Sequence, residues 1–212
     1  FTLVALLAGV STAFGQVSFP LDNAVWKQRH GNEDAPPTYS IIGTKTADVV
    51  LGGTTYRKVY QSFDDAVFSE SEYIGGIREA SGGKVYYRGA TSTSETLIFD
   101  FSVAVGDTIT DAPTGMKSGI VYAIDYVTID GISRKRITFR QQSSSAPWTG
   151  NYWIEGIGNS SLGGFMGSPM LQPTCDCGVK TVCLSTNGNV VYQNPGFTDV
   201  GCDMVVSVPD VP

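Results

Sequence analysis

The stretch Ile120-Val-Tyr-Ala-Ile-Asp-Tyr-Val-Thr-Ile-Asp-Gly-Ile-Ser-Arg-Lys-Arg-Ile-Thr-Phe-Arg140 decides the fold class. It contains two runs of β-branched and aromatic residues separated by Asp130-Gly131. Asp-Gly between such runs is a strong hairpin signal, because both positions of a tight hairpin turn adopt positive φ. The sequence therefore predicts a long antiparallel hairpin over 120–140. A period of two places four residues of its first strand on one face: Ile120, Tyr122, Ile124 and Tyr126.

The same signals recur on both sides of this hairpin. Gly52-Gly53, Gly82-Gly83 and Asn187-Gly188 each separate two short runs of strand-forming residues. Further strands are expected at 95–101, 108–110 and 152–157. No helical apolar stripe continues for about a dozen residues without Gly or Pro. We predict an all-β fold with little or no helix, in which an antiparallel meander of about ten to twelve strands closes into a barrel-like or sandwich domain.

Charge and histidine content exclude several function classes. The chain has 14 Lys and Arg against 20 Asp and Glu, a net charge of -6, which argues against nucleic acid as a partner. Its single His, His30, excludes most metal sites built from several histidines, and we expect neither a metal nor a cofactor. His30 belongs to a polar run, 27–34, that is expected to form a solvated loop.

The ends of the sequence suggest export. Residues 1–15 are uncharged and mostly apolar, and they end on small residues. This pattern is typical of a secretory signal peptide without its basic first part, with Ala13 and Gly15 placing the cleavage before Gln16. We expect 16–204 to form a single all-β domain, and the proline-containing 205–212 to form a linker or frayed tail. No other stretch has transmembrane length. The expected location is therefore secreted or at the cell surface.

Export permits disulfides. The four cysteines are Cys175, Cys177, Cys183 and Cys202, and four cysteines allow three pairings. A bridge between Cys175 and Cys177 closes a very small ring. We expect Cys183 to pair with Cys202 across about 20 residues, which leaves Cys175 with Cys177 by elimination. A Cys177–Cys202 pair is the alternative.

Aromatic and acidic residues near 150 provide the candidate site. Trp148, Tyr152 and Trp153 could form a platform on which a sugar ring stacks. The leading hypothesis is a non-catalytic surface, adhesion or glycan-contacting module, because the chain shows no catalytic set and no Gly-x-Ser-x-Gly elbow. The alternative is a secreted glycan hydrolase that uses Glu155 and a second carboxylate still to be identified. Arg134, Arg136 and Arg140 are expected on one solvated sheet face.

A series of short motifs resembles a known group of proteins. The motifs are Gly53-Thr-Thr-Tyr-Arg-Lys-Val-Tyr60, Tyr73-Ile-Gly-Gly-Ile-Arg-Glu79, Glu95-Thr-Leu-Ile-Phe-Asp-Phe101, Trp153-Ile-Glu-Gly-Ile-Gly158 and Cys183-Leu-Ser. In this order, they resemble exported, largely uncharacterised all-β proteins of Bacteroidota, which commonly carry a C-terminal sorting domain for type IX secretion. The resemblance implies export and no catalytic residue. It also supports the Cys183–Cys202 pair, because both positions match the usual cysteines of that group.

Overall fold

The computed structural model describes residues 15–31, 36–63, 72–110, 118–142, 144–147, 152–160, 164–166 and 178–202. This part of the chain is all-β, as predicted, and its only helical element is a single 3₁₀ turn, η1 (Pro195–Phe197). The strands are β1 (Ala24–Gly31), β2 (Thr38–Leu51), β3 (Thr54–Ser62), β4 (Tyr73–Ala80), β5 (Lys84–Gly89), β6 (Thr96–Asp100), β7 (Thr108–Thr110), β8 (Ser118–Ile129), β9 (Ile132–Gln141), β10 (Tyr152–Ile154), β11 (Gly158–Asn159), β12 (Gly178–Thr186) and β13 (Asn189–Gln193).

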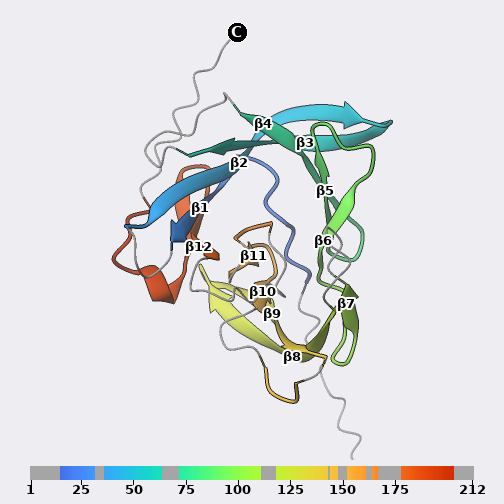
Figure 1. Cartoon of the computed structure of the whole chain (residues 1–212), viewed down its shortest axis with the longest axis vertical. Helices are drawn as coiled ribbons and strands as arrows, with labels where there is room; N and C mark the ends of the chain where they lie inside the picture. The colour runs from blue at the N-terminus through green and yellow to red at the C-terminus, as the bar shows by residue number, and fades with distance from the viewer. Residues whose placement is uncertain are drawn as a thin grey trace, which may run out of the picture.

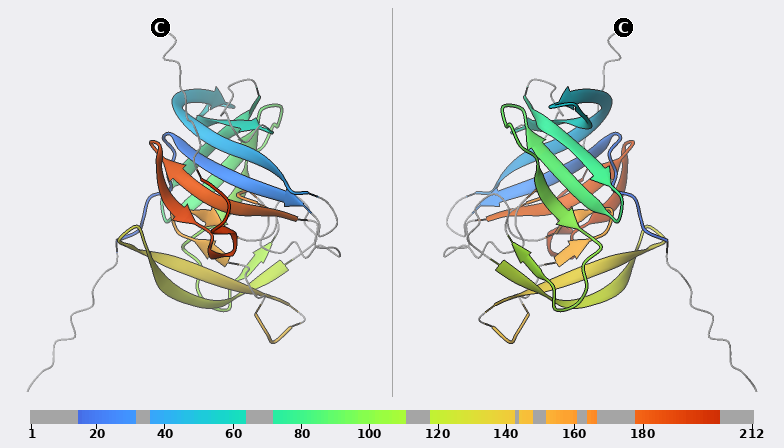
Figure 2. Two further views of the ribbon diagram at one scale, coloured as in Figure 1. Left: turned by 90° about the vertical axis from the view of Figure 1, so that its left-hand side faces the viewer. Right: turned by 90° about the vertical axis from the view of Figure 1, so that its right-hand side faces the viewer.

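The strands form two curled antiparallel sheets that enclose one main core (Figures 1 and 2). The larger sheet has the order β13-β12-β1-β2-β3-β4-β5-β6, and the smaller sheet has the order β11-β10-β9-β8-β7. Figure 1 shows the larger sheet arching over the smaller one. Most neighbours are consecutive in sequence, as in the predicted meander. The exception is β1, which lies between β2 and the distant β12.

Aromatic rings fill the space between the sheets. Trp26 stacks on Phe165 with ring centroids 3.9 Å apart, and Phe19 lies 5.7 Å from both Trp26 and Phe99. The indole N–H of Trp26 donates to the carbonyl of Ile157 at 2.8 Å, so its polar atom is satisfied inside the core. These large rings belong to the same buried cluster as Phe139 and Trp153 of the smaller sheet, so aromatic packing joins the two sheets.

The predicted hairpin over 120–140 is confirmed, but its first strand does not keep the single alternation that was expected. Asp130 and Gly131 have φ of 51° and 71°, as a tight hairpin turn requires. A register shift in β8 places Val121 opposite Phe139, whereas Ala123 lies opposite Thr138. The extra residue reverses the alternation, since two residues of β8 then face one of β9. Tyr122 is consequently 41% exposed, and the common face predicted for 120, 122, 124 and 126 is wrong.

Up to residue 31, the polar run around His30 forms a strand and not the predicted loop. It belongs to β1, which is hydrogen-bonded to β12 on one side and β2 on the other. His30 Nε2 lies 2.6 Å from the hydroxyl of Ser40 on β2, and burial lowers the pKa of His30. The strand signal was missed because the side chains are polar, whereas the pairing comes from β12, far away in the sequence.

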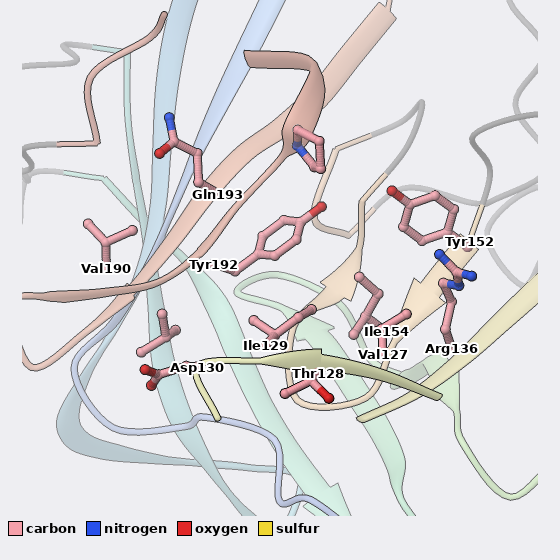
Figure 3. A pocket seen from close by; sticks show the side chains of 12 residues that line it. Val127, Thr128, Ile129, Asp130, Arg136, Tyr152, Ile154, Val190, Tyr192 and Gln193 are labelled. Carbon is pink, nitrogen blue, oxygen red and sulfur yellow. The ribbon is translucent and has the colours of Figure 1, made fainter. Parts of the chain in front are cut away.

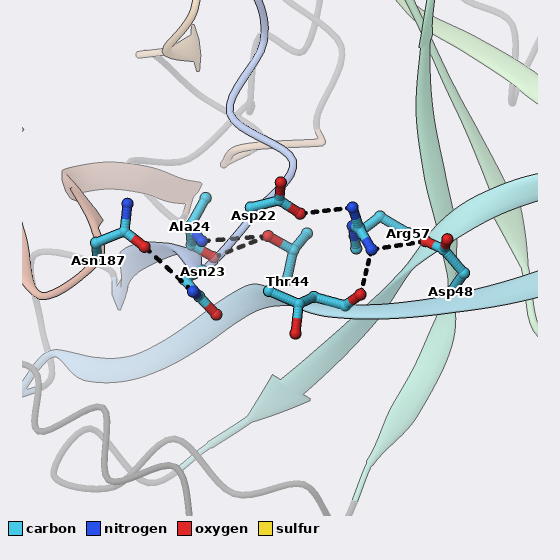
Figure 4. Close-up of polar contacts among 8 residues, drawn as sticks. Asp22, Asn23, Ala24, Thr44, Asp48, Arg57 and Asn187 are labelled. Carbon is cyan, nitrogen blue, oxygen red and sulfur yellow. Dashed lines mark hydrogen bonds and ion pairs between the residues drawn. The ribbon is translucent and has the colours of Figure 1, made fainter. Parts of the chain in front are cut away.

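Arg57 on β3 stabilises an irregular stretch of β2 (Figure 4). The ladder between these strands shifts register between Thr44 and Asp48. The Arg57 guanidinium donates to the carbonyl of Thr46, to Asp48 at 2.7 Å and to Asp22 at 2.6 Å. A single side chain therefore satisfies main-chain and carboxylate oxygens at the bulge and ties the segment before β1 to the sheet.

The disulfide between Cys183 and Cys202 is present, which confirms the expected pair. Their Cα atoms are 6.2 Å apart. The bond holds the C-terminal segment against a second apolar cluster that includes Val25, Ile41 and Val182. Cys175 and Cys177 lie outside the described residues, so their pairing stays a prediction.

Glu95 accepts a network of hydrogen bonds on the larger sheet. Arg78 donates from Nε to Glu95 Oε2 at 2.9 Å and from Nη2 to Oε1 at 2.5 Å, and the Tyr56 hydroxyl donates to Oε2 at 2.7 Å. The hydrogen bond from Arg78 is the largest of the effects that lower the pKa of Glu95.

We expect this network to make stability depend on acid pH. Since the folded-state pKa of Glu95 is depressed, its contribution is present above the unfolded pKa of about 4.3 and is lost as pH falls through the folded pKa. Urea unfolding of wild type and Glu95→Gln between neutral and acid pH measures the effect. The difference in stability should shrink in acid, whereas the exposed control Glu72→Gln should show no such change. Parallel profiles for wild type and Glu95→Gln would contradict the prediction.

Candidate functional site

A groove opens where the edge strand β13 of the larger sheet meets the outer side of β8, β9 and β10 (Figure 3). Its volume is about 470 Å³, within the range of roughly 300–1,000 Å³ that is usual for small-molecule sites. Its walls are mostly aliphatic and aromatic, with few charged groups. The lining residues used below are Ile129, Asp130, Arg136, Tyr152, Val190 and Tyr192.

Strand alternation separates two of the predicted sugar-binding residues. Tyr152 and Trp153 are adjacent on β10, so their side chains point to opposite faces of the sheet. Tyr152 lines the groove. Trp153 is 3% exposed, and its ring centroid lies 4.7 Å from that of Phe139 in the core. The stacking role predicted for Trp153 is therefore wrong, because its ring faces are covered. Trp148 lies outside the described residues.

Tyr192 is a groove residue that sequence reasoning missed. Its side chain is 5% exposed, and among the described residues its hydroxyl makes no hydrogen bond of good geometry, although Tyr152 and Ser160 lie close enough to act on its pKa as hydrogen-bonding neighbours. Figure 3 shows the hydroxyls of Tyr192 and Tyr152 directed toward each other. Burial raises the pKa of Tyr192 well above its ordinary value, and the neighbouring Tyr152 raises this pKa further. The sequence does predict the strand after Asn187-Gly188 that contains Tyr192. It cannot place this strand beside β10, because that depends on how the two sheets pack.

Arg136 supplies a positive charge at the groove. It donates from Nε to Asp125 Oδ1 at 2.8 Å and from Nη2 to Oδ2, and this hydrogen bonding holds the pKa of Asp125 below its usual range. Its guanidinium lies 5.5 Å from the ring centroid of Tyr152. Arg134 does not line the groove. It is 6% exposed, and its guanidinium packs against the turn at Gly156. The predicted solvated face of three arginines is therefore wrong at Arg134.

Glu155 occupies a different and smaller cavity of about 230 Å³. It is 6% exposed, and the only hydrogen bond of its carboxylate in the described structure comes from the Lys135 main-chain N–H at 3.4 Å. The neighbouring carboxylate is Glu79, whose pKa is raised by burial and by the charge of Glu155. Glu79 Oε2 accepts from the Phe19 N–H at 3.0 Å. The cavity is smaller than typical ligand sites, so this geometry does not favour the hydrolase hypothesis.

Across the described residues, no group of three or more His, Cys, Asp or Glu side chains is arranged to hold a metal ion. The same residues contain no helix with the length and apolar character needed to cross a membrane. Comparisons with known protein families, with curated proteins and with solved structures found no match. The groove is therefore the feature of the molecule that bears on its function.

Proposed function

We propose that this protein is an exported β domain that binds carbohydrate without catalysis, through the groove lined by Tyr152 and Tyr192. The observation that carries the proposal is the buried Tyr192 hydroxyl, which makes no hydrogen bond of good geometry among the described residues. A buried hydroxyl that lacks a partner costs free energy, and a ligand hydroxyl can remove that cost by bonding to it. The free protein thus presents a poorly satisfied hydroxyl in a groove whose walls are mostly aliphatic and aromatic.

A carbohydrate matches both kinds of surface in this groove. Its C–H faces can pack on the Tyr152 ring and on Ile129 and Val190, while its hydroxyls can bond to Tyr192, Arg136 and Asp130. Export is supported by the signal-like composition of residues 1–15 and by the Cys183–Cys202 disulfide, since disulfides persist in oxidising compartments.

Tyr192→Phe tests the proposal because it removes only the hydroxyl. Since that hydroxyl makes no hydrogen bond of good geometry among the described residues, we expect the melting temperature to stay the same or rise slightly. Affinity for the bound glycan should fall about tenfold, the equivalent of one lost hydrogen bond of about 1.4 kcal/mol. A glycan array identifies the ligand, and calorimetry on the best hit measures the affinity.

Tyr122→Phe is the matched control, because Tyr122 is 41% exposed and does not line the groove. It should leave both melting temperature and affinity unchanged. Wild-type affinity in Tyr192→Phe would show that the groove is not the binding site. An array on which the wild-type protein binds no glycan would remove carbohydrate as the ligand.

A further inference from the structure

The segment directly after the predicted signal cleavage site contacts the body of the protein, although Gln16 and Ser18 are themselves exposed. The Gln16 side chain lies against Gly83, where a Cβ atom would come within 2.6 Å of its amide nitrogen. Val17 and Ser18 pack over Gly156, and Phe19 enters the core with an exposure of 4%. Figure 2 shows this dark blue segment beside the tip of the β8–β9 hairpin. The first residues of a domain are usually poorly ordered unless they are tied down, as these are.

Gln16 and Glu155 line the same cavity. Glu155 is buried, and its carboxylate has no ion pair and only one long hydrogen bond among the described residues. The two neighbouring cations make their hydrogen bonds to main-chain carbonyls, although the charge of Arg134 still acts on Glu155. Arg134 Nη1 donates to the main-chain carbonyl of Glu155 at 3.1 Å, and Lys135 Nζ donates to the carbonyl of Phe101 at 2.7 Å. A buried carboxylate with so few partners is costly, and a cation in its cavity would stabilise it.

We propose that cleavage after Gly15 creates that cation, and that the new α-ammonium of Gln16 is held by Glu155. Hydrolysis of the Gly15–Gln16 peptide bond consumes one water, leaving a carboxylate on Gly15 and an ammonium on Gln16. The cavity therefore recognises the processed amino terminus of its own chain. This inference rests on the proposed export, but it does not depend on what the groove binds.

The first test determines the amino terminus. The full chain, preceded by a complete secretory signal, is expressed in a secreting host, and the N-terminal peptide of the exported protein is sequenced by mass spectrometry. We expect it to begin at Gln16 with a free amine. A terminus at another residue overturns the inference, and so does a cyclised terminus lighter by one ammonia, because neither carries an ammonium at Gln16. Glycan binding is measured separately, so its loss leaves this result unaffected.

The second test measures the coupling between the amine and the carboxylate. Selective acetylation of the Gln16 amine should lower the melting temperature by about 2–4 °C, the shift that roughly 1 kcal/mol produces in a chain of this size. In Glu155→Gln, acetylation should have almost no effect, since the two changes then remove one shared interaction. Glu79→Gln is the matched control and should retain the full acetylation effect. Equal shifts in wild type and Glu155→Gln would overturn the proposed pair.

Discussion

Replacing Trp153 by alanine is expected to lower the free energy of unfolding by about 3–5 kcal/mol, the usual cost of truncating a buried aromatic residue. The indole is 3% exposed, and its ring centroid lies 4.7 Å from that of Phe139 and 5.4 Å from that of Phe99. Alanine would leave a cavity between rings contributed by both sheets. Urea denaturation monitored by circular dichroism measures the loss.

Tyr152→Ala is the matched comparison, because Tyr152 adjoins Trp153 but lines the groove. It should cost much less stability and should weaken glycan binding. The proposed arrangement is contradicted if Trp153→Ala keeps wild-type stability while losing its ligand, because the indole would then act as a binding surface. Trp153→Ala is therefore a test of the core, and Tyr152→Ala is a test of the site.

Removing the disulfide should have the second largest effect. Cys183 and Cys202 are separated by 19 positions, and closing a loop of that length stabilises a folded chain by about 3 kcal/mol in the chain-entropy model. We expect Cys183→Ala combined with Cys202→Ala to lose about this amount in urea denaturation. The C-terminal segment should also become more sensitive to proteolysis, because the disulfide holds it against the cluster around Val25 and Ile41.

Alkylation provides the control for this prediction. In wild-type protein that is denatured without reductant, both Cys183 and Cys202 should resist modification, and both should react after reduction. Modification of either thiol before reduction would contradict the pairing. Replacing Cys175 and Cys177 by serine should leave the reactivity of this pair unchanged.

Local sequence signals predicted the hairpins well. The turns at Gly52-Gly53, Gly82-Gly83, Asp130-Gly131 and Asn187-Gly188 all join paired antiparallel strands. They could be recognised because positive φ favours Gly, Asn and Asp over a few adjacent residues, independently of the rest of the chain.

Features that depend on distant partners were predicted poorly. The expected strand over 152–157 ends at residue 154, where the chain turns to form the short strand β11. The site prediction was affected in the same way. The sequence does not distinguish Tyr152 from Trp153 and does not point to Tyr192, because only the packing of β13 against β10 shows which tyrosines share a groove.

By itself, the sequence determined the all-β class and the hairpin turns, and it favoured the Cys183–Cys202 pair that the structure confirms. These features follow from turn geometry, strand alternation and cysteine spacing, which act over short stretches of chain. Only the tertiary structure decided that β1 joins β12, that Trp153 is a core residue and that the Tyr192 hydroxyl is buried beside Tyr152 at the groove. Each of these depends on which surfaces the two curled sheets bury against each other, a balance of packing over the whole domain that no local pattern encodes.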